Sequence, residues 1–172
     1  MPRSDQGVLG NRYQIVPRVL IFLTKGEAVL LLKGAPHKRL WANLYNGIGG
    51  HIERGEDALS AARRELFEEA GLQEDLWLCG TVFIDVGEDT GIGIFVYRGE
   101  YRGHQQPVPS QEGELHWIGA DHLDQVRLVE DLAVLLPEVL KSKCGQPPFS
   151  ARYYYDEYDR LQIKIAGNQG SC

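Results

Sequence analysis

The sequence predicts an α+β fold, and three features of its pattern support that class. Apolar, β-rich runs come before and after an amphipathic helix, which gives the order strands, helix, strands. A second helix with an apolar face is expected late in the chain, at residues 129–143. With 172 residues and 43% hydrophobic content, the chain has the size of one globular domain with a sizeable core.

The first strands are expected at the centre of the sheet. Residues 14–23 and 27–32 are continuous apolar runs joined by the turn 24–26, which predicts a hairpin buried on both faces. A polar, basic loop at residues 33–42 then leads into a glycine-rich strand and turn at residues 43–50. The remaining strands of the main domain are expected at residues 76–86, 92–101 and 114–118.

The helix between these strands has a clear start and stop. Glu56 and Asp57 suit its positive N-terminus, and Gly71 suits the left-handed position after its last turn. One buried stripe is expected along it, formed by Leu59, Ala62, Leu66 and Ala70. In the second helix, Pro137 is expected to kink or split the helix.

The C-terminal segment predicts a β-hairpin. Pro147 and Pro148 end the second helix, and two strand-like runs at residues 149–155 and 161–166 flank a polar turn. Its tyrosines are expected to cover the functional site, to form a dimer contact or simply to pack. These boundaries predict an N-terminal extension at residues 1–12, a main domain at residues 13–144 and a hairpin extension at residues 145–172, packed on that domain.

Charge and cysteine content exclude several functions. The net charge of −6, without a stripe of Lys and Arg, argues against a nucleic acid polymer as partner. Cys79, Cys144 and Cys172 lack the spacing of zinc ligands or of a CxxC motif, which favours reduced thiols. Since the sequence has neither a signal-peptide core nor a run long enough to span a membrane, we expect a cytoplasmic protein, monomeric or homodimeric, without membrane contact.

Three carboxylates crowd the end of the first helix. Glu65, Glu68 and Glu69 stand at positions i, i+3 and i+4, where their mutual repulsion is destabilising unless a cation compensates it. Oxygen ligands of this kind suit Mg²⁺ or Mn²⁺ better than zinc. An acidic solvated face would explain an isolated pair of glutamates, but it does not explain the spaced glycines, Glu56 and Arg64.

The pattern around these acids resembles the Nudix box, the signature of the Nudix hydrolases. Its defining positions are all filled, by Gly50, Glu56, Arg64, Glu65, Leu66, Glu68, Glu69, Gly71 and Leu72. The resemblance implies the Nudix fold, in which a mixed sheet lies between helices as an α/β/α sandwich. It also implies hydrolysis of a diphosphate bond in a nucleoside diphosphate linked to another group, with Mg²⁺ and a small nucleotide substrate.

The resemblance also assigns roles within the motif. Glu65 and Glu69 look like the principal metal ligands, and Glu68 shares contacts with metal or water. The backbone carbonyl of Gly49 completes the ligand set. Arg64 resembles the family arginine that pairs with a glutamate, here Glu56, and orients the catalytic helix.

The general base is expected to come from a loop beyond the motif, as it often does in relatives. Glu112 and Glu114 precede the last strand of the main domain, and we favour Glu112. A solvated loop acid is the plain alternative for Glu112. Glu68 is a further candidate for the base.

Four residues are candidates for contact with substrate. Asn46 matches an asparagine that reads the base edge in MutT-like enzymes, which hydrolyse oxidised purine nucleoside triphosphates. The resemblance implies that an acidic pair near the start of the last helix, here Glu130-Asp131, can join it. His51 and Lys33 are candidates for phosphate contact. The plain alternatives are a turn for Asn46, a favourable helix dipole for Asp131, and a strand edge or solvated loop for His51 and Lys33.

Three aromatic residues, Trp41, Tyr45 and Trp117, are candidates for stacking on a base or for packing in the core. The predicted reaction is the Mg²⁺-dependent conversion of a nucleoside triphosphate, with oxidised purines favoured, into monophosphate and pyrophosphate. ADP-ribose or another nucleotide conjugate is the alternative substrate. A non-catalytic nucleotide-binding regulatory module is the alternative from another class, and the intact set of acids argues against it.

Overall fold

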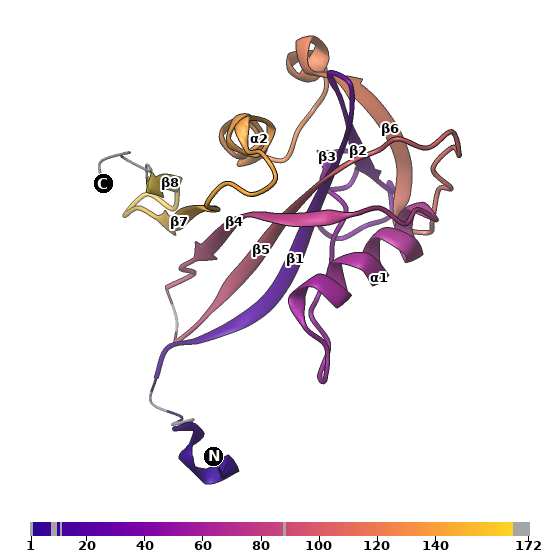
Figure 1. Ribbon diagram of the computed structural model, residues 1–172. Helices are drawn as coiled ribbons and strands as arrows, with labels where there is room; N and C mark the ends of the chain where they lie inside the picture. Colours follow the sequence, from indigo (N-terminus) through magenta and orange to yellow (C-terminus); the bar gives the residue numbers. More distant parts are fainter. Residues whose placement is uncertain (1, 8–9, 11, 88, 167–172) are drawn as a thin grey trace.

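A mixed β-sheet organises the computed structural model, which describes residues 2–7, 10, 12–87 and 89–166 (Figure 1). Within those residues the strands are β1 Gln14–Lys25, β2 Ala28–Gly34, β3 Tyr45–Asn46, β4 Leu76–Ile84, β5 Thr90–Glu100, β6 Gly113–Gly119, β7 Phe149–Tyr155 and β8 Leu161–Ala166. The order across the sheet is β3-β2-β1-β5-β4-β7-β8, and β6 pairs with β2. The helical segments are α1 Ala58–Ala70, α2 Leu132–Lys141 and the short 3₁₀ turns η1 Arg3–Gln6 and η2 Ala120–Gln125.

The helices α1 and α2 cover opposite faces of this sheet (Figure 1). Val19, Ile21 and Leu23 of β1 are buried in a cluster with α1, whereas Phe22 is buried in a second cluster with α2. Because side chains alternate across a strand, β1 lies between the two helices and is covered on both sides. The predicted α+β class and its α/β/α layering are confirmed. None of the helices in the described part of the chain is long and apolar enough to cross a membrane.

The first two strands separate soon after the turn that joins them. Their antiparallel ladder contains Thr24↔Val29 and Lys25↔Ala28, and β2 then pairs with β6 along its whole length. The predicted hairpin is therefore confirmed at its turn but not along its strands. On its other side, β1 pairs with β5 in parallel over eleven residues, from Gln14↔Thr90 to Thr24↔Glu100.

The glycine-rich segment enters the space between β1 and β2. Ile48 bridges to Ile21, and His51 bridges to Arg18, both in antiparallel orientation. The segment therefore lies beside the central strand, on the side that β2 has left. This placement brings it to the face of the sheet covered by α1, because Ile48 is buried in the same cluster as Leu66 of α1.

Helix α1 begins and ends where the sequence predicts. The Asp57 carboxylate accepts hydrogen bonds from the backbone nitrogens of Leu59 and Ser60, at 2.9 and 3.0 Å, which satisfies two donors of the first turn. Gly71 follows the helix in the left-handed conformation, with φ of 67°. The buried face consists of Ala61, Ala62, Leu66, Glu69 and Ala70, so three residues of the predicted stripe are buried, Leu59 is only partly buried, and the face contains an acid.

The predicted second helix was too long at its start. Residues 127–129 are extended, because Tyr45 N donates to Arg127 O at 2.8 Å and Val129 N donates to Tyr45 O at 3.0 Å. Helix formation begins only at Leu132, after this pairing with β3 ends. Pro137 lies inside α2 and does not split it. The missing N–H removes one intrahelical hydrogen bond, and the apolar face packed on the sheet keeps the helix in place.

The predicted C-terminal hairpin is confirmed, and it extends the main sheet. Strand β7 pairs in parallel with β4, and β8 pairs in antiparallel fashion with β7. An isolated hairpin is marginally stable, so this pairing explains how the hairpin is held. Residues 1, 8–9, 11 and 167–172, which belong to the predicted terminal extensions, lie outside the described residues.

Candidate active site

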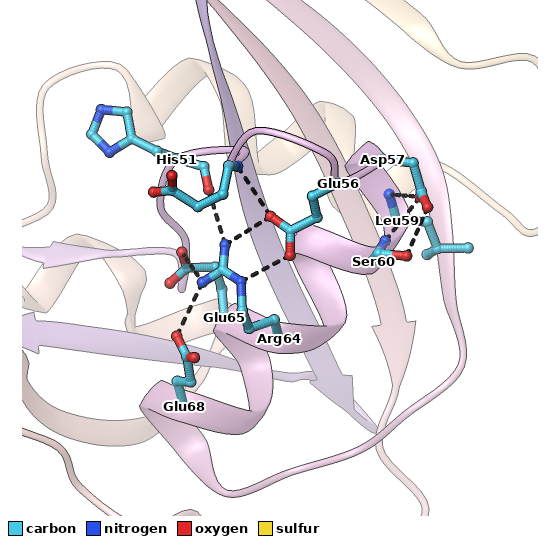
Figure 2. Close-up of polar contacts among 9 residues, drawn as sticks. His51, Glu56, Asp57, Leu59, Ser60, Arg64, Glu65 and Glu68 are labelled. Carbon is cyan, nitrogen blue, oxygen red and sulfur yellow. Dashed lines mark hydrogen bonds and ion pairs between the residues drawn. The ribbon is translucent and has the colours of Figure 1, made fainter.

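Arg64 organises the acidic end of α1 (Figure 2). Its Nε and one terminal nitrogen donate to the two carboxylate oxygens of Glu56, at 2.9 and 3.0 Å. The other terminal nitrogen donates to Glu65 Oε1 at 2.8 Å and to Glu68 Oε2 at 3.0 Å. The hydrogen bond to Glu56, followed by that to Glu65, raises the pKa of Arg64. The permanently charged guanidinium group of Arg64 therefore fixes three carboxylates relative to one another.

Arg64 also joins α1 to the glycine-rich segment. A terminal nitrogen donates to the backbone carbonyl of His51 at 3.0 Å, and the Glu56 carboxylate accepts from the backbone nitrogen of Glu53 at 3.1 Å. Its hydrogen bond with Arg64 is the main reason that the pKa of Glu56 is lowered. These contacts are those expected of a pair that aligns the helix with the loop, since both residues use their polar atoms on protein partners.

The backbone of the glycine-rich segment directs Gly49 away from β1. Two hydrogen bonds attach the segment to β1, Val19 N to Gly50 O at 2.9 Å and Ile21 N to Ile48 O at 2.7 Å. Because backbone groups of successive strand residues point in opposite directions, the N–H and C=O of Gly49 point into the space that β2 has left. A backbone hydrogen bond from Gly49 lowers the pKa of Glu69, so these groups lie beside the acids.

Gly49 and Gly50 make the close approach between loop, strand and helix sterically feasible. A Cβ added at Gly50 would lie 2.2 Å from Glu65 Oε1, and one added at Gly49 would lie 2.2 Å from Val19 O. Both distances are far inside van der Waals contact, so a side chain at either position would displace Glu65 or β1. Neither glycine has a left-handed backbone, and the paired glycines are thus required by space alone.

Glu69 is the buried acid of the site. It is 8% exposed, and its Oε2 has no hydrogen-bond partner among the described residues. Burial, followed by the charges of Glu65 and Glu112, raises the pKa of Glu69 to about 7. A buried carboxylate with a free oxygen is strongly disfavoured in its charged form unless a cation lies beside it.

The residues at this position fit a divalent cation. Glu65, Glu69 and the carbonyl of Gly49 supply only oxygen donors, the type that hard cations prefer. No three acidic, His or Cys side chains form a ready ligand cluster within the described ranges, and Arg64 engages one oxygen each of Glu65 and Glu68. A bound cation would use the remaining oxygens of these acids together with the free Oε2 of Glu69.

The structure separates the two loop acids considered as general base. Glu112 lines the same cleft as Glu69, and its Oε2 lies 2.5 Å from Lys38 Nζ. The charge of Glu112 raises the pKa of Glu69, so the two carboxylates are close. Glu114 belongs to β6, lies 3.4 Å from His116 and is not among the residues that line the cleft. Only Glu112 of this pair lies at the acidic site.

One cleft of about 1090 Å³ brings the acids together with the second group of predicted residues. Its volume lies slightly above the usual range for small-molecule sites, which leaves room for a nucleotide. Asn46, His51 and Asp131 line this cleft, and so do the basic residues Arg18, Lys38 and Arg39. Lys33, which lies on β2 between Tyr45 and Glu114, is not among the residues that line it.

The polar groups of Asn46 and Asp131 differ in how they are engaged. Asn46 Oδ1 accepts a hydrogen bond from Gly47 N at 2.8 Å, so Asn46 does stabilise the local turn. Its amide NH₂ remains as a donor. Asp131 precedes α2, yet its side chain makes no capping hydrogen bond within the described part of the chain. Burial raises the pKa of Asp131. Asp131 thus stands at the N-terminus of α2, where the helix-dipole alternative places it, without a capping hydrogen bond.

The apolar wall of the cleft includes two of the hairpin tyrosines, for which a place at the functional site was one of the expected roles, whereas its other residues were not identified from the sequence. It is formed by side chains of β4, β5 and the C-terminal hairpin, namely Ile84, Ile92, Ile94, Tyr153, Tyr155 and Leu161. These residues meet because β7 pairs with β4 across a long stretch of sequence. The alternating pattern of the hairpin was the available signal, but it does not identify the neighbouring strand.

The three aromatic candidates for base stacking occupy different places. Trp41 lines the cleft, is exposed, and has a left-handed backbone with φ of 60°. Tyr45 packs edge-on against His116, with ring centroids 5.6 Å apart. Trp117 packs against Tyr101 at 5.4 Å. Of the three, only Trp41 can reach a ligand in this cleft.

Comparison with known proteins assigns this fold and site to a family. The family model described as NUDIX domain matches residues 13–139, so the chain belongs to the Nudix family and is a Nudix hydrolase. Enzymes of this family generally use divalent cations, in agreement with the oxygen donors of the site.

Two relatives and one solved structure illustrate the similarity. The chain is 32% identical over 127 residues to an oxidized purine nucleoside triphosphate hydrolase from Danio rerio, covering 72% of this chain and 79% of that protein. It is 27% identical over 132 residues to the NAD-capped RNA hydrolase NudC from Pectobacterium carotovorum, covering 71% of this chain and 48% of that protein. The crystal structure of a MutT protein from Bacillus halodurans superposes with a TM-score of 0.72 at 18% identity, covering 87% and 97% of the two chains.

Proposed function

We propose that this Nudix hydrolase converts purine nucleoside triphosphates, with oxidised purines favoured, into nucleoside monophosphate and pyrophosphate, with Mg²⁺ as the metal. The cleft supports this most directly, because Glu65 and Glu69 line it together with Asn46 and Asp131. A triphosphate can thus meet the acids through Mg²⁺ while its base meets the amide and carboxylate. The similarity to the Danio rerio enzyme supports the same substrate class.

The reaction requires water to attack phosphorus while negative charge spreads over the phosphate oxygens. Mg²⁺ held by Glu65, Glu69 and the Gly49 carbonyl would neutralise that charge and orient the phosphates. Lys38 and Arg39 line the same cleft and add positive charge for the remaining phosphate oxygens. The protein contributes mainly through placement, which the rigid contacts of Arg64 support.

Glu112 serves in this proposal as the general base that takes a proton from the attacking water. Its place beside Glu69 and its ion pair with Lys38 support the assignment. Glu68 is half-exposed and paired with Arg64, which suits a contact with metal or water. His51 lines the cleft and is proposed to hydrogen-bond a phosphate oxygen.

A turnover screen with Mg²⁺ tests the proposal. The substrates are 8-oxo-dGTP, dGTP, dATP, ADP-ribose and a dinucleoside polyphosphate, and the readout is released pyrophosphate or monophosphate. We expect the highest kcat/KM with 8-oxo-dGTP, and Glu69→Gln serves as the inactive control. Turnover of ADP-ribose without triphosphates would replace the proposed substrate class with nucleotide conjugates. Binding without turnover of any substrate would instead indicate a non-catalytic module.

A further inference from the structure

Tyr153 carries a buried hydroxyl that its described neighbours satisfy poorly. The residue is 1% exposed, and its hydroxyl forms no hydrogen bond of normal geometry with the described part of the chain. It nevertheless lines the cleft that holds the acids. An unpaired buried hydroxyl is destabilising, and phenylalanine would fill the same space without that loss. A tyrosine in this position therefore suggests that the hydroxyl has a partner when the cleft is occupied.

The surroundings of Tyr153 point to a polar partner. The residue lies in β7, beyond the segment 13–139 that the family model matches. Asp131 lines the same cleft and lies beside this hydroxyl, because burial, then the charge of Asp131 and a hydrogen bond with it that falls outside normal geometry, raise the pKa of Tyr153. Asn46 also lines the cleft with its NH₂ group free to donate. The Tyr153 hydroxyl, the Asp131 carboxylate and the Asn46 amide are thus polar groups in a cleft whose wall is otherwise apolar.

We propose that the Tyr153 hydroxyl is a specificity-determining hydrogen-bond donor, which binds a carbonyl oxygen on the nucleobase of the substrate next to Asp131. The inference rests on the proposed function, because it assumes that a nucleotide occupies the cleft. Its consequence is a preference for bases that carry a carbonyl, such as guanine and 8-oxoguanine, over adenine. Sites that hydrogen-bond a ligand discriminate strongly against analogues that lack the matching group.

The matched control is Tyr154→Phe. Tyr154 is the next residue on β7 and does not line the cleft; its ring lies under the cationic groups of Arg152 and Lys164, at 5.1 and 5.3 Å. Tyr154→Phe therefore removes one hydroxyl oxygen from β7, as Tyr153→Phe does, but it leaves the lining of the cleft unchanged.

The test compares Tyr153→Phe with the wild type and this control. We expect kcat/KM for 8-oxo-dGTP and dGTP to fall about tenfold, mainly through KM, with a much smaller change for dATP. The thermal unfolding midpoint of the ligand-free variant should stay equal or rise, because an unpaired hydroxyl is removed. A lower midpoint with unchanged kinetics would show a structural hydroxyl and overturn the inference. An equal loss for dATP and dGTP would also overturn it.

Binding of the product analogue 8-oxo-dGMP, measured by calorimetry without metal, separates this inference from the proposed reaction. About tenfold weaker binding to Tyr153→Phe supports the inference even if the wild type hydrolyses none of the triphosphates, an outcome that refutes only the proposed reaction. Equal affinity for wild type and variant, or no binding to either, overturns the role of Tyr153.

Discussion

Lys38 and Glu112 join two loops of the cleft through an ion pair, with 2.5 Å between Nζ and Oε2. The backbone reinforces the link, because Ala35 N donates to Glu112 O at 2.9 Å. Glu112 is therefore held in place from two sides, although it lies in a loop. A general base needs such positioning, since proton transfer requires it to stay within hydrogen-bond reach of the attacking water.

Glu112→Gln should lower kcat by about 10²- to 10³-fold, because the amide cannot accept the proton from water. Glu114→Gln is the matched control, since Glu114 lies two residues away on β6 and does not line the cleft. Steady-state kinetics on 8-oxo-dGTP check both variants. Comparable losses in the two variants, or normal turnover in Glu112→Gln, would remove Glu112 from the base role and favour Glu68.

Glu69→Gln should reduce turnover by about 10³-fold or more while the fold is kept, since a charged ligand is lost with little change in volume. The affinity for Mn²⁺, measured by electron paramagnetic resonance, should fall in parallel. Glu100→Gln on the exposed end of β5 is the control for charge removal. Near-normal activity with normal Mn²⁺ binding would exclude Glu69 from the metal site.

The same acid should make the stability of the metal-free protein depend on pH. The pKa of Glu69 is raised from 4.5 to about 7, so its stabilising contribution is complete below pH 4.5 and is lost as pH rises through 7. In EDTA at pH 8, Glu69→Gln should therefore be more stable than the wild type by about 3 kcal/mol. Urea unfolding at several pH values measures this difference, which should shrink toward pH 4.5.

Addition of Mg²⁺ at pH 8 provides the internal control for this stability difference. The cation stabilises the charged form of Glu69 in the wild type and has less effect on the variant. A difference between the two proteins that is the same at every pH, with and without Mg²⁺, would contradict the assignment of Glu69 as the buried titrating acid.

Arg64→Lys should lower kcat by about 10- to 100-fold, because a lysine cannot donate to both oxygens of Glu56 while also contacting His51 O. Arg63→Lys on the exposed face of α1 should leave kcat unchanged. A double-mutant cycle with Glu56→Gln should show strong non-additivity, because the two residues act as one unit. Simple additivity would mean that the pair does not align the helix.

Asn46→Ala should lower kcat/KM for 8-oxo-dGTP by about tenfold, because the free NH₂ donor of Asn46 is lost. The loss should be smaller for a nucleotide whose base does not present the matching acceptor. Asn43→Gly is the control, because Asn43 is exposed and has a φ of 59° that glycine accepts without strain. A uniform loss over all substrates in Asn46→Ala would indicate a structural turn residue.

Features that depend on neighbouring residues in the chain were predictable from the sequence. Asp57 and Gly71 mark the ends of α1 because capping is a local interaction. The closeness of Glu65 and Glu69 follows directly from helix geometry. The strands of the C-terminal hairpin were also predicted at their observed bounds, since alternating side chains and a polar turn define them locally.

Features that depend on distant segments were not predictable in this way. The helix was predicted to begin at Val129, but Val129 pairs with Tyr45, so a tertiary hydrogen bond overrides its local preference. Tyr153 reaches the cleft only because β7 lies beside β4. The separation of β1 from β2 likewise reflects the competing partners β5 and β6, which a single hairpin pattern does not encode.

The hydrogen bonds between the glycine-rich segment and β1 fix the register of the motif. The carbonyls of Ile48 and Gly50 are bonded to β1, and that of Gly49 points the opposite way. A slip of one residue along β1 would reverse all of these directions, and the Gly49 carbonyl would then bond to β1 and no longer face the acids. Insertion of a single residue between Asn46 and Gly49 is therefore expected to abolish hydrolytic activity, although every side chain of the motif is still present.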